Sequence, residues 1–213
     1  TLKMLKDAGL ERIEVGIQSG SQRIRKEIFE RPVSDKTLIK VANRINQFNI
    51  VPFYDLIVDN PFEADEDKRQ SLDFILKLPR PFHLRMFPLT YFPNTKLTKL
   101  ALSSKLISQD QVESVAERTH NKWFVTLDYP WSNRERFWIS LFSLTSKDFI
   151  PKVLIRFLSQ SRFLQRYPRL LSSFATLANN IKLGTIAIKW ILEGKPLKAI
   201  FRQTSKGRSH WQI

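Results

Sequence analysis

The run Ile50-Val51-Pro52-Phe53-Tyr54-Asp55-Leu56-Ile57-Val58 is almost continuously apolar, and Asp55 is its one charged residue. A short run of this kind is typical of a strand buried on both faces of a parallel sheet. Upstream, Ser34 is placed as the N-cap of a helix, with Thr37 at the capping-box position. Downstream, residues 65–67 are all acidic and suit the positive end of a helix dipole. The sequence therefore predicts a strand between two helices.

Two further strand patterns lie outside these helices. Residues 12–18 are β-favouring and end in a Gly/Ser turn, and residues 83–92 form the third strand pattern. Additional helices are predicted over residues 21–30, which end at Arg31-Pro32, and over residues 95–102. This alternation predicts an α/β fold with parallel strands and right-handed crossovers, in a doubly wound or barrel arrangement.

The second half of the chain has a different character. Pro168 is expected to split residues 150–177 into at least two helices, and residues 183–192 are expected to form another, which stops at Gly194. We divide the chain into three segments: 1–104 with the three strand–helix units, 105–130 as a helical connector, and 131–213 as a basic, aromatic-rich, all-α region.

The net charge of +15 is distributed unevenly. Residues 1–130 carry 20 basic and 17 acidic side chains, whereas residues 131–213 carry 15 basic and 3 acidic ones. Such an asymmetry favours a polyanionic partner, either an anionic membrane surface or nucleic acid, although a solvated basic face on a structural helical cap explains it equally well. No RNA-binding motif is present, so a nucleic-acid partner ranks last. No apolar run has the length of a membrane span, and there is no cysteine to form a disulfide or to bind a metal.

Three strand ends carry unusual residues, at plausible spacing along residues 1–105. They are Val15-Gly16-Ile17-Gln18-Ser19-Gly20-Ser21 with Arg31 one helix later, Tyr54-Asp55-Leu56-Ile57-Val58-Asp59-Asn60-Pro61-Phe62-Glu63, and Leu89-Thr90-Tyr91-Phe92-Pro93-Asn94-Thr95-Lys96-Leu97. Together they resemble the fourth, fifth and sixth strand–loop units of the radical S-adenosylmethionine (SAM) superfamily, in the branch that carries a cobalamin-binding domain.

The resemblance implies a fold and a set of cofactors. The fold would be the C-terminal half of a partial (β/α)6 TIM-like barrel. The intact enzyme would cleave SAM reductively at a [4Fe-4S] cluster, to give a 5′-deoxyadenosyl radical, with a reductant such as flavodoxin or ferredoxin, a small-molecule or lipid-like substrate and, in this branch, cobalamin. The CxxxCxxC segment that holds the cluster would lie upstream. We expect this chain to be a C-terminal portion, inactive alone, and cytoplasmic or peripheral to the membrane.

The chemistry of SAM suggests which residues would contact it. In related enzymes, the residues that match Gln18, Arg31 and Asp55 contribute to the SAM pocket. The Gln18 amide and the Ser19 hydroxyl suit its ribose or amino-acid groups, and Arg31 suits its carboxylate. Asp55 would accept hydrogen bonds from the ribose or orient Arg31. Because ligands sit at the carboxyl ends of parallel strands, the Thr90-Tyr91 loop is a further candidate for contact with substrate or cofactor.

Structural roles are open for the same residues. Gln18 and Ser19 are suited to capping the helix that follows them. Arg31 would also serve as an exposed cation at a helix end, and a salt bridge would satisfy Asp55. Gly16 and Gly20 are expected to leave room for a ligand or for a sharp turn. The sequence departs from the family pattern at Asp59-Asn60-Pro61 and at Asn94, where glycine is more usual.

Overall fold

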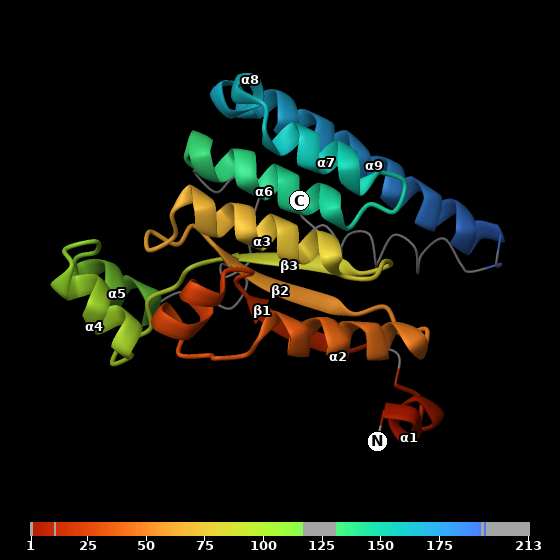
Figure 1. Ribbon diagram of the computed structural model, residues 1–213, viewed down its shortest axis with the longest axis horizontal. Coiled ribbons are helices and arrows are strands. Elements are labelled where there is room, and N and C mark those ends of the chain that lie inside the picture. Colours follow the sequence, from red (N-terminus) through yellow and green to blue (C-terminus); the bar gives the residue numbers. More distant parts are fainter. Residues whose placement is uncertain (1, 11, 117–130, 193, 195–213) are drawn as a thin grey trace.

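The computed structural model describes residues 2–10, 12–116, 131–192 and 194. The described part contains three strands among helices (Figure 1). Their bounds are α1 Leu2–Asp7, β1 Glu14–Gln18, the π-helix η1 Ile24–Ile28, α2 Asp35–Gln47, β2 Phe53–Val58, α3 Asp65–Lys77, β3 His83–Pro88, α4 Lys96–Ser103, α5 Gln109–Ala116, α6 Asn133–Thr145, α7 Lys152–Ser159, α8 Arg162–Arg166 and α9 Pro168–Leu192. Part of the predicted connector, 117–130, and the tail beyond 194 lie outside the described residues.

The three strands form one parallel sheet in the order β1-β2-β3. Helix α2 connects β1 to β2, and α3 connects β2 to β3. The predicted α/β class and the parallel strands are therefore confirmed. The third strand ends at Pro88, earlier than the predicted residue 92.

Local hydrogen bonds begin the helices where the sequence indicates. The Ser34 hydroxyl accepts the Thr37 N–H at 3.1 Å, and the Thr95 hydroxyl accepts the Thr98 N–H at 3.2 Å. Before α3, the Asp67 carboxylate accepts the Ala64 N–H at 2.9 Å. Each bond satisfies a backbone N–H that lacks a partner within its helix.

One face of the sheet is buried and the other is only partly covered. Tyr54, Leu56 and Val58 alternate along β2 and are each 1% exposed, in a core that also contains residues of α2, α3 and α6. The residues between them, such as Asp55, are half-buried. The prediction that residues 50–58 are buried on both faces is therefore wrong. The second face carries the ion pair of Asp55 and Arg85.

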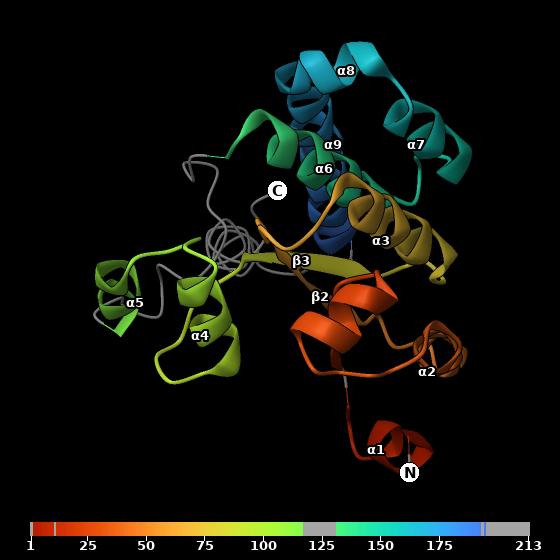
Figure 2. The same cartoon turned by 60° about the vertical axis from the view of Figure 1, so that its left-hand side comes forward.

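The helices after residue 131 stack outward from the sheet (Figures 1 and 2). Helix α6 packs against α3 and β3, and α9 packs along α6. A single buried cluster extends from Ile17 to Ala178 and so joins the strand–helix units to the later helices. The boundaries of the three proposed segments stay a prediction.

Helix α9 runs without a break from Pro168 to Leu192. Pro168 begins a new helix, as predicted, but the separate helix expected at 183–192 is the continuation of α9. The buried residues Leu171, Ala175 and Ala178 hold α9 against α6 along its first half. Asn179 is tolerated within it, because its side-chain oxygen accepts a hydrogen bond from Lys147 at 2.9 Å.

Candidate functional site on the partly open face of the sheet

Strand register places a row of three residues across the partly open face. Gly16 pairs with Asp55, and Asp55 pairs with Arg85. Registered neighbours in a parallel sheet project to the same side. The row therefore brings the end of β1 next to a charged pair on β2 and β3.

Arg85 binds carboxylates on both neighbouring strands. Its Nε and Nη2 donate to the Asp55 oxygens at 2.7 and 2.8 Å, and its Nη1 and Nη2 donate to the Glu14 oxygens at 2.9 and 2.8 Å. Partial burial opposes the charge on Arg85, but these hydrogen bonds outweigh it and raise the pKa of the guanidinium. The Arg85 bond also lowers the pKa of Glu14. The sequence left two ionic roles open for Asp55, orientation of Arg31 or a structural salt bridge. The salt bridge is observed, and its partner is Arg85 rather than Arg31.

Gln18 and Arg31 converge over Gly16. A Cβ placed on Gly16 would lie 2.4 Å from the Gln18 Nε2 atom and 3.2 Å from the Arg31 Nη1 atom. The space above the glycine backbone is therefore the space that the two side chains share. Within the described ranges, neither side chain makes a hydrogen bond or an ion pair. Two adjacent donor groups therefore have no partner among the described residues.

The backbone explains how Gln18 reaches this position. The pairing of β1 with β2 shifts between Gly16 and Gln18, so that Ile17 is the extra residue and enters the core. Gln18 adopts a φ of 68°, which is uncommon for a residue with a side chain. Bulges and left-handed residues of this kind re-aim side chains and are frequent beside binding sites.

The π-helix η1 places Arg31. The wide turn ends at Phe29, whose N–H donates to the Ile24 carbonyl, and the Arg31 N–H donates to the Arg25 carbonyl at 2.7 Å. Arg25 is 1% exposed, donates to the Ser19 carbonyl at 2.7 Å and forms an ion pair with Asp35. A buried arginine thereby fixes the segment that carries Arg31 to the end of β1. The predicted regular helix over 21–30 is a short π-helix instead.

Ser19 lies on the other side of the chain from Gln18. Its side chain is fully buried, donates to Glu63 at 2.8 Å and accepts the Ser21 N–H at 3.2 Å. The structure therefore does not bring Ser19 together with Gln18 and Arg31, and its hydrogen bond to Ser21 resembles the capping role. At Gly20, a Cβ would lie 2.3 Å from the Ser71 Cα atom, so this glycine allows close packing against α3 rather than ligand approach.

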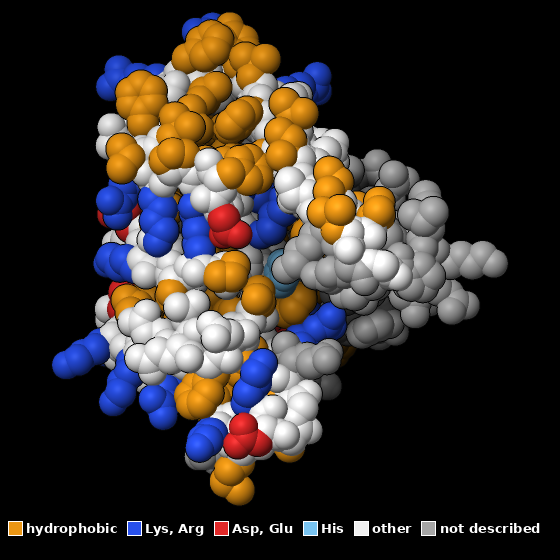
Figure 3. All heavy atoms as spheres, turned by 90° about the vertical axis from the view of Figure 1, so that its right-hand side faces the viewer, with side chains coloured by type: hydrophobic (Ala, Val, Ile, Leu, Met, Phe, Trp, Pro, Cys, Tyr) orange, Lys and Arg blue, Asp and Glu red, His pale blue; other side chains and the backbone are white. Residues whose placement is uncertain are grey.

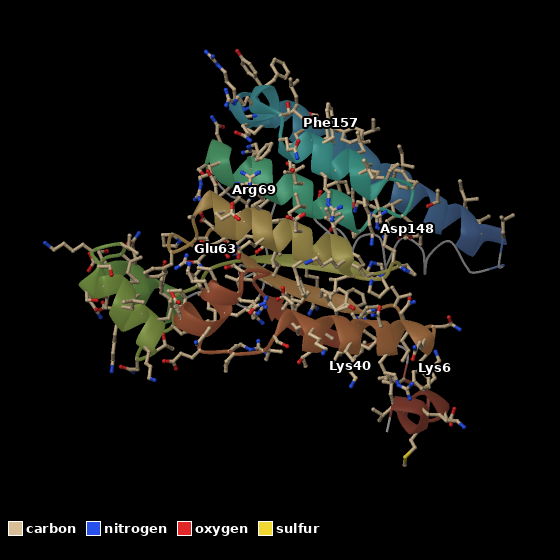
Figure 4. The ribbon with its side chains drawn as sticks, in the orientation of Figure 1. Lys6, Lys40, Glu63, Arg69, Asp148 and Phe157 are labelled. Atoms are coloured by element: carbon tan, nitrogen blue, oxygen red, sulfur yellow. The ribbon has the colours of Figure 1, made fainter. Side chains whose placement is uncertain are left out.

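A buried ionic triad lies beneath Ser19. The Lys68 Nζ atom is 3.5 Å from Glu63 and 2.5 Å from Glu135, and all three residues are almost inaccessible to solvent. Figure 4 labels Glu63 beside the start of α3. Burial raises the pKa of Glu63, against the opposing effects of Lys68 and Ser19. Glu135 also accepts the Asp59 N–H at 3.2 Å, so the triad ties α6 to the carboxyl end of β2.

The predicted Thr90-Tyr91 loop follows β3 at the same end of the sheet. The Thr90 hydroxyl donates to the Pro88 carbonyl at 3.2 Å, and both residues are half-buried. Burial, and then the nearby Asp59 carboxylate, raise the pKa of Tyr91 to about 12. The loop therefore approaches the end of β2, as carboxyl ends of parallel strands do.

A pocket of about 490 Å³ opens between η1 and α4. It is lined by Glu27, Ile28, Phe29, Glu30, Thr95, Lys96, Leu97 and Leu100. Glu30 and Lys96 form an exposed ion pair at 2.9 Å across its rim. None of the predicted SAM contacts lines this pocket, although Arg31 directly follows Glu30.

Metal-binding groups are not found in the part of the chain that the structure describes. No three of its His, Asp and Glu side chains cluster as metal ligands would, and the sequence has no cysteine. The residues that organise the site and that sequence analysis missed are Arg25, Lys68 and Arg85. Arg85 carries a usable signal, because a charged residue within an apolar strand requires a partner, as does Asp55.

Comparison with known proteins found no match: no family model matches the chain, and no curated protein matches its sequence.

Proposed function

We propose that this chain forms half of the cofactor pocket of a radical SAM enzyme, and that Gln18 and Arg31 bind the amino-acid end of SAM. The observation that carries the proposal is the convergence above Gly16 of these two donor groups, which have no partner among the described residues. A guanidinium and an amide side by side suit a carboxylate, which can accept a hydrogen bond from each. In this proposal, the partly open face lines the interior of a partial (β/α)6 barrel.

Asp55 and Arg85 have a positioning role. Both Asp55 oxygens accept hydrogen bonds from Arg85, and each keeps a lone pair that a ribose hydroxyl can use. The pair also links β2 to β3 beside the proposed ligand position. Bound beside a reduced cluster, SAM supplies the hydrogen-abstracting chemistry of this enzyme class. This chain has no thiolate for a [4Fe-4S] cluster, so its residues are assigned to binding and orientation alone, and cobalamin and the reductant enter only through the resemblance.

Titration of the chain with SAM tests the proposal. We expect Arg31→Met to weaken binding by about tenfold to 100-fold, since it removes a charge-assisted hydrogen bond. Gly16→Ala should weaken it as well, because the added Cβ displaces both donors. The matched control is Arg69→Met, which removes an exposed arginine that lies outside the site, on α3 (Figure 4).

Competition by methionine sharpens the assignment. Methionine alone should compete with SAM on the wild-type chain and should lose this ability on Arg31→Met, whereas 5′-deoxyadenosine should compete equally on both. Absence of SAM binding to the wild-type chain, or an equal loss with Arg69→Met, would refute the proposed site.

A further inference from the structure

An exposed apolar patch covers the outermost helices. In Figure 3, hydrophobic side chains gather over α7, α8 and α9, above a band of Lys and Arg side chains. Their main contributors are each more than half exposed: Val153, Phe157, Phe163, Leu170, Leu177 and Ile188. We call these six residues the α7–α9 patch. Contiguous large apolar side chains on a protein surface mark sites that contact a partner or a membrane.

Helix α9 has two apolar stripes, and only one is buried. Leu171, Ala175 and Ala178 recur at helical spacing and face α6. Leu170 and Leu177, one position earlier in each turn, form a second stripe that stays in solvent. A helix that is apolar around most of its circumference is normally covered on more than one side. The second stripe therefore requires a partner beyond the elements described.

The charges on the helices that carry the patch are of one sign. Residues 151–192 include seven basic side chains and no acidic one. Arg162, Arg166 and Arg169 are exposed between the apolar residues of α8 and early α9. Two positively charged faces brought together by a two-fold axis would repel each other, which disfavours a second copy of the chain as the occupant.

We propose that the α7–α9 patch docks on an anionic lipid bilayer. Apolar side chains of α7, α8 and α9 enter the interface between headgroups and acyl chains, and Arg162, Arg166 and Arg169 bind lipid phosphates. The proposed mode of contact is attachment to one surface of the bilayer. No helix among the described residues combines the length and apolarity needed to cross a bilayer. Nucleic acid would use the arginines but would leave the exposed Leu, Ile and Phe side chains without a role.

Vesicle co-sedimentation of the 213-residue chain tests this proposal. We compare vesicles of phosphatidylcholine alone with vesicles that also contain phosphatidylglycerol, at low and high salt. Strong binding to the anionic vesicles, weak binding to the neutral ones and a loss with added salt are expected. Equal binding to both compositions, or no binding to either, would overturn it.

Two sets of variants separate the apolar and the electrostatic contributions. Phe157→Gln with Phe163→Gln and Leu177→Gln should abolish binding, while the control set Met4→Gln, Leu100→Gln and Leu106→Gln, which are also exposed, should leave it unchanged.

Removing three positive charges, Arg162→Gln, Arg166→Gln and Arg169→Gln, should weaken binding by about 100-fold, at roughly a factor of five per charge. The control set Lys3→Gln, Lys6→Gln and Lys40→Gln removes the same charge far from the patch (Figure 4 labels Lys6, Lys40 and Phe157). Equal effects of the two sets would contradict a local docking surface. Dimerisation that the apolar variants abolish would also contradict the proposal, since a second copy of the chain would then cover the patch. RNA binding that the apolar variants leave intact, together with an absence of vesicle binding, would contradict it as well.

Discussion

At the carboxyl end of the strands, buried charge is balanced by opposite charge, whereas at the amino end it is balanced by helix carbonyls. In the first region, Lys68 lies between Glu63 and Glu135. In the second, Arg80 donates to the carbonyls of Thr145, the last residue of α6, and of Ile150, which precedes α7, at 2.8 and 2.7 Å.

Three lysines complete the amino-end cluster. Lys182 donates to the Ser146 carbonyl at 2.6 Å, and Lys152 donates to the Leu78 carbonyl at 3.0 Å. Lys147 binds Asn179 but has Lys182 as a neighbour, and burial, reinforced by this like charge, lowers the pKa of Lys147 to about 7. Asp148, labelled in Figure 4, opposes the shift.

The two ends of the sheet keep a cation in the protein interior in different ways. An ion pair needs both partners, so losing one leaves a full charge without compensation. Backbone carbonyls and amide oxygens carry only partial negative charge, so they offset the burial of a cation less than a carboxylate does. The carboxyl end should therefore be sensitive to mutation, and the amino end should be sensitive to pH.

Lys68→Met should have the largest effect. It leaves two glutamates buried without their cation, which we expect to lower the free energy of unfolding by about 3–5 kcal/mol. The measurement is urea unfolding at neutral pH followed by circular dichroism. Lys77→Met, at the exposed end of the same helix, is the matched control and should change stability by less than about 0.5 kcal/mol. If both variants unfold at the same urea concentration, the triad does not stabilise the fold.

Lys147→Met should change how stability depends on pH. The unfolded chain keeps the Lys147 proton up to about pH 10, whereas the folded protein releases it near 7, so the unfolded state binds more protons in this window. Wild-type stability should therefore rise with pH from about 7 to 9.5, by up to about 1.4 kcal/mol per pH unit. In Lys147→Met most of this rise should disappear, while Lys77→Met should retain it. Parallel pH profiles for the wild type and Lys147→Met would contradict the buried, destabilised cation.

Arg80→Met should have the smallest effect of the three. It removes two hydrogen bonds to carbonyls. It also removes a guanidinium whose burial is unfavourable, because burial lowers the pKa of Arg80. We expect a loss of about 1–2 kcal/mol in the free energy of unfolding. Arg69→Met again serves as the exposed control. A loss as large as that of Lys68→Met would remove the distinction between the two ends.

The part of the fold that depends on local interactions could be predicted from the sequence. Ser34 and Thr95 begin helices through bonds to residues three positions away, and the apolar alternation with helices marks three parallel strands. The candidate site was only partly predictable. Gln18 and Arg31 meet above Gly16, but Ser19 turns into the core, because successive side chains at the end of β1 point to opposite sides of the chain.

The sequence by itself determined where the helices and strands form, because hydrogen bonds within a few residues and the periodicity of apolar side chains are written in consecutive positions. Only the tertiary structure decided which buried charges meet. Ser19 bonds to Glu63 across 44 positions, and Lys68 of α3 pairs with Glu135 of α6. Such partners are selected by strand register and helix packing, since burying a charge is favourable only where the folded chain brings a compensating group within hydrogen-bonding distance.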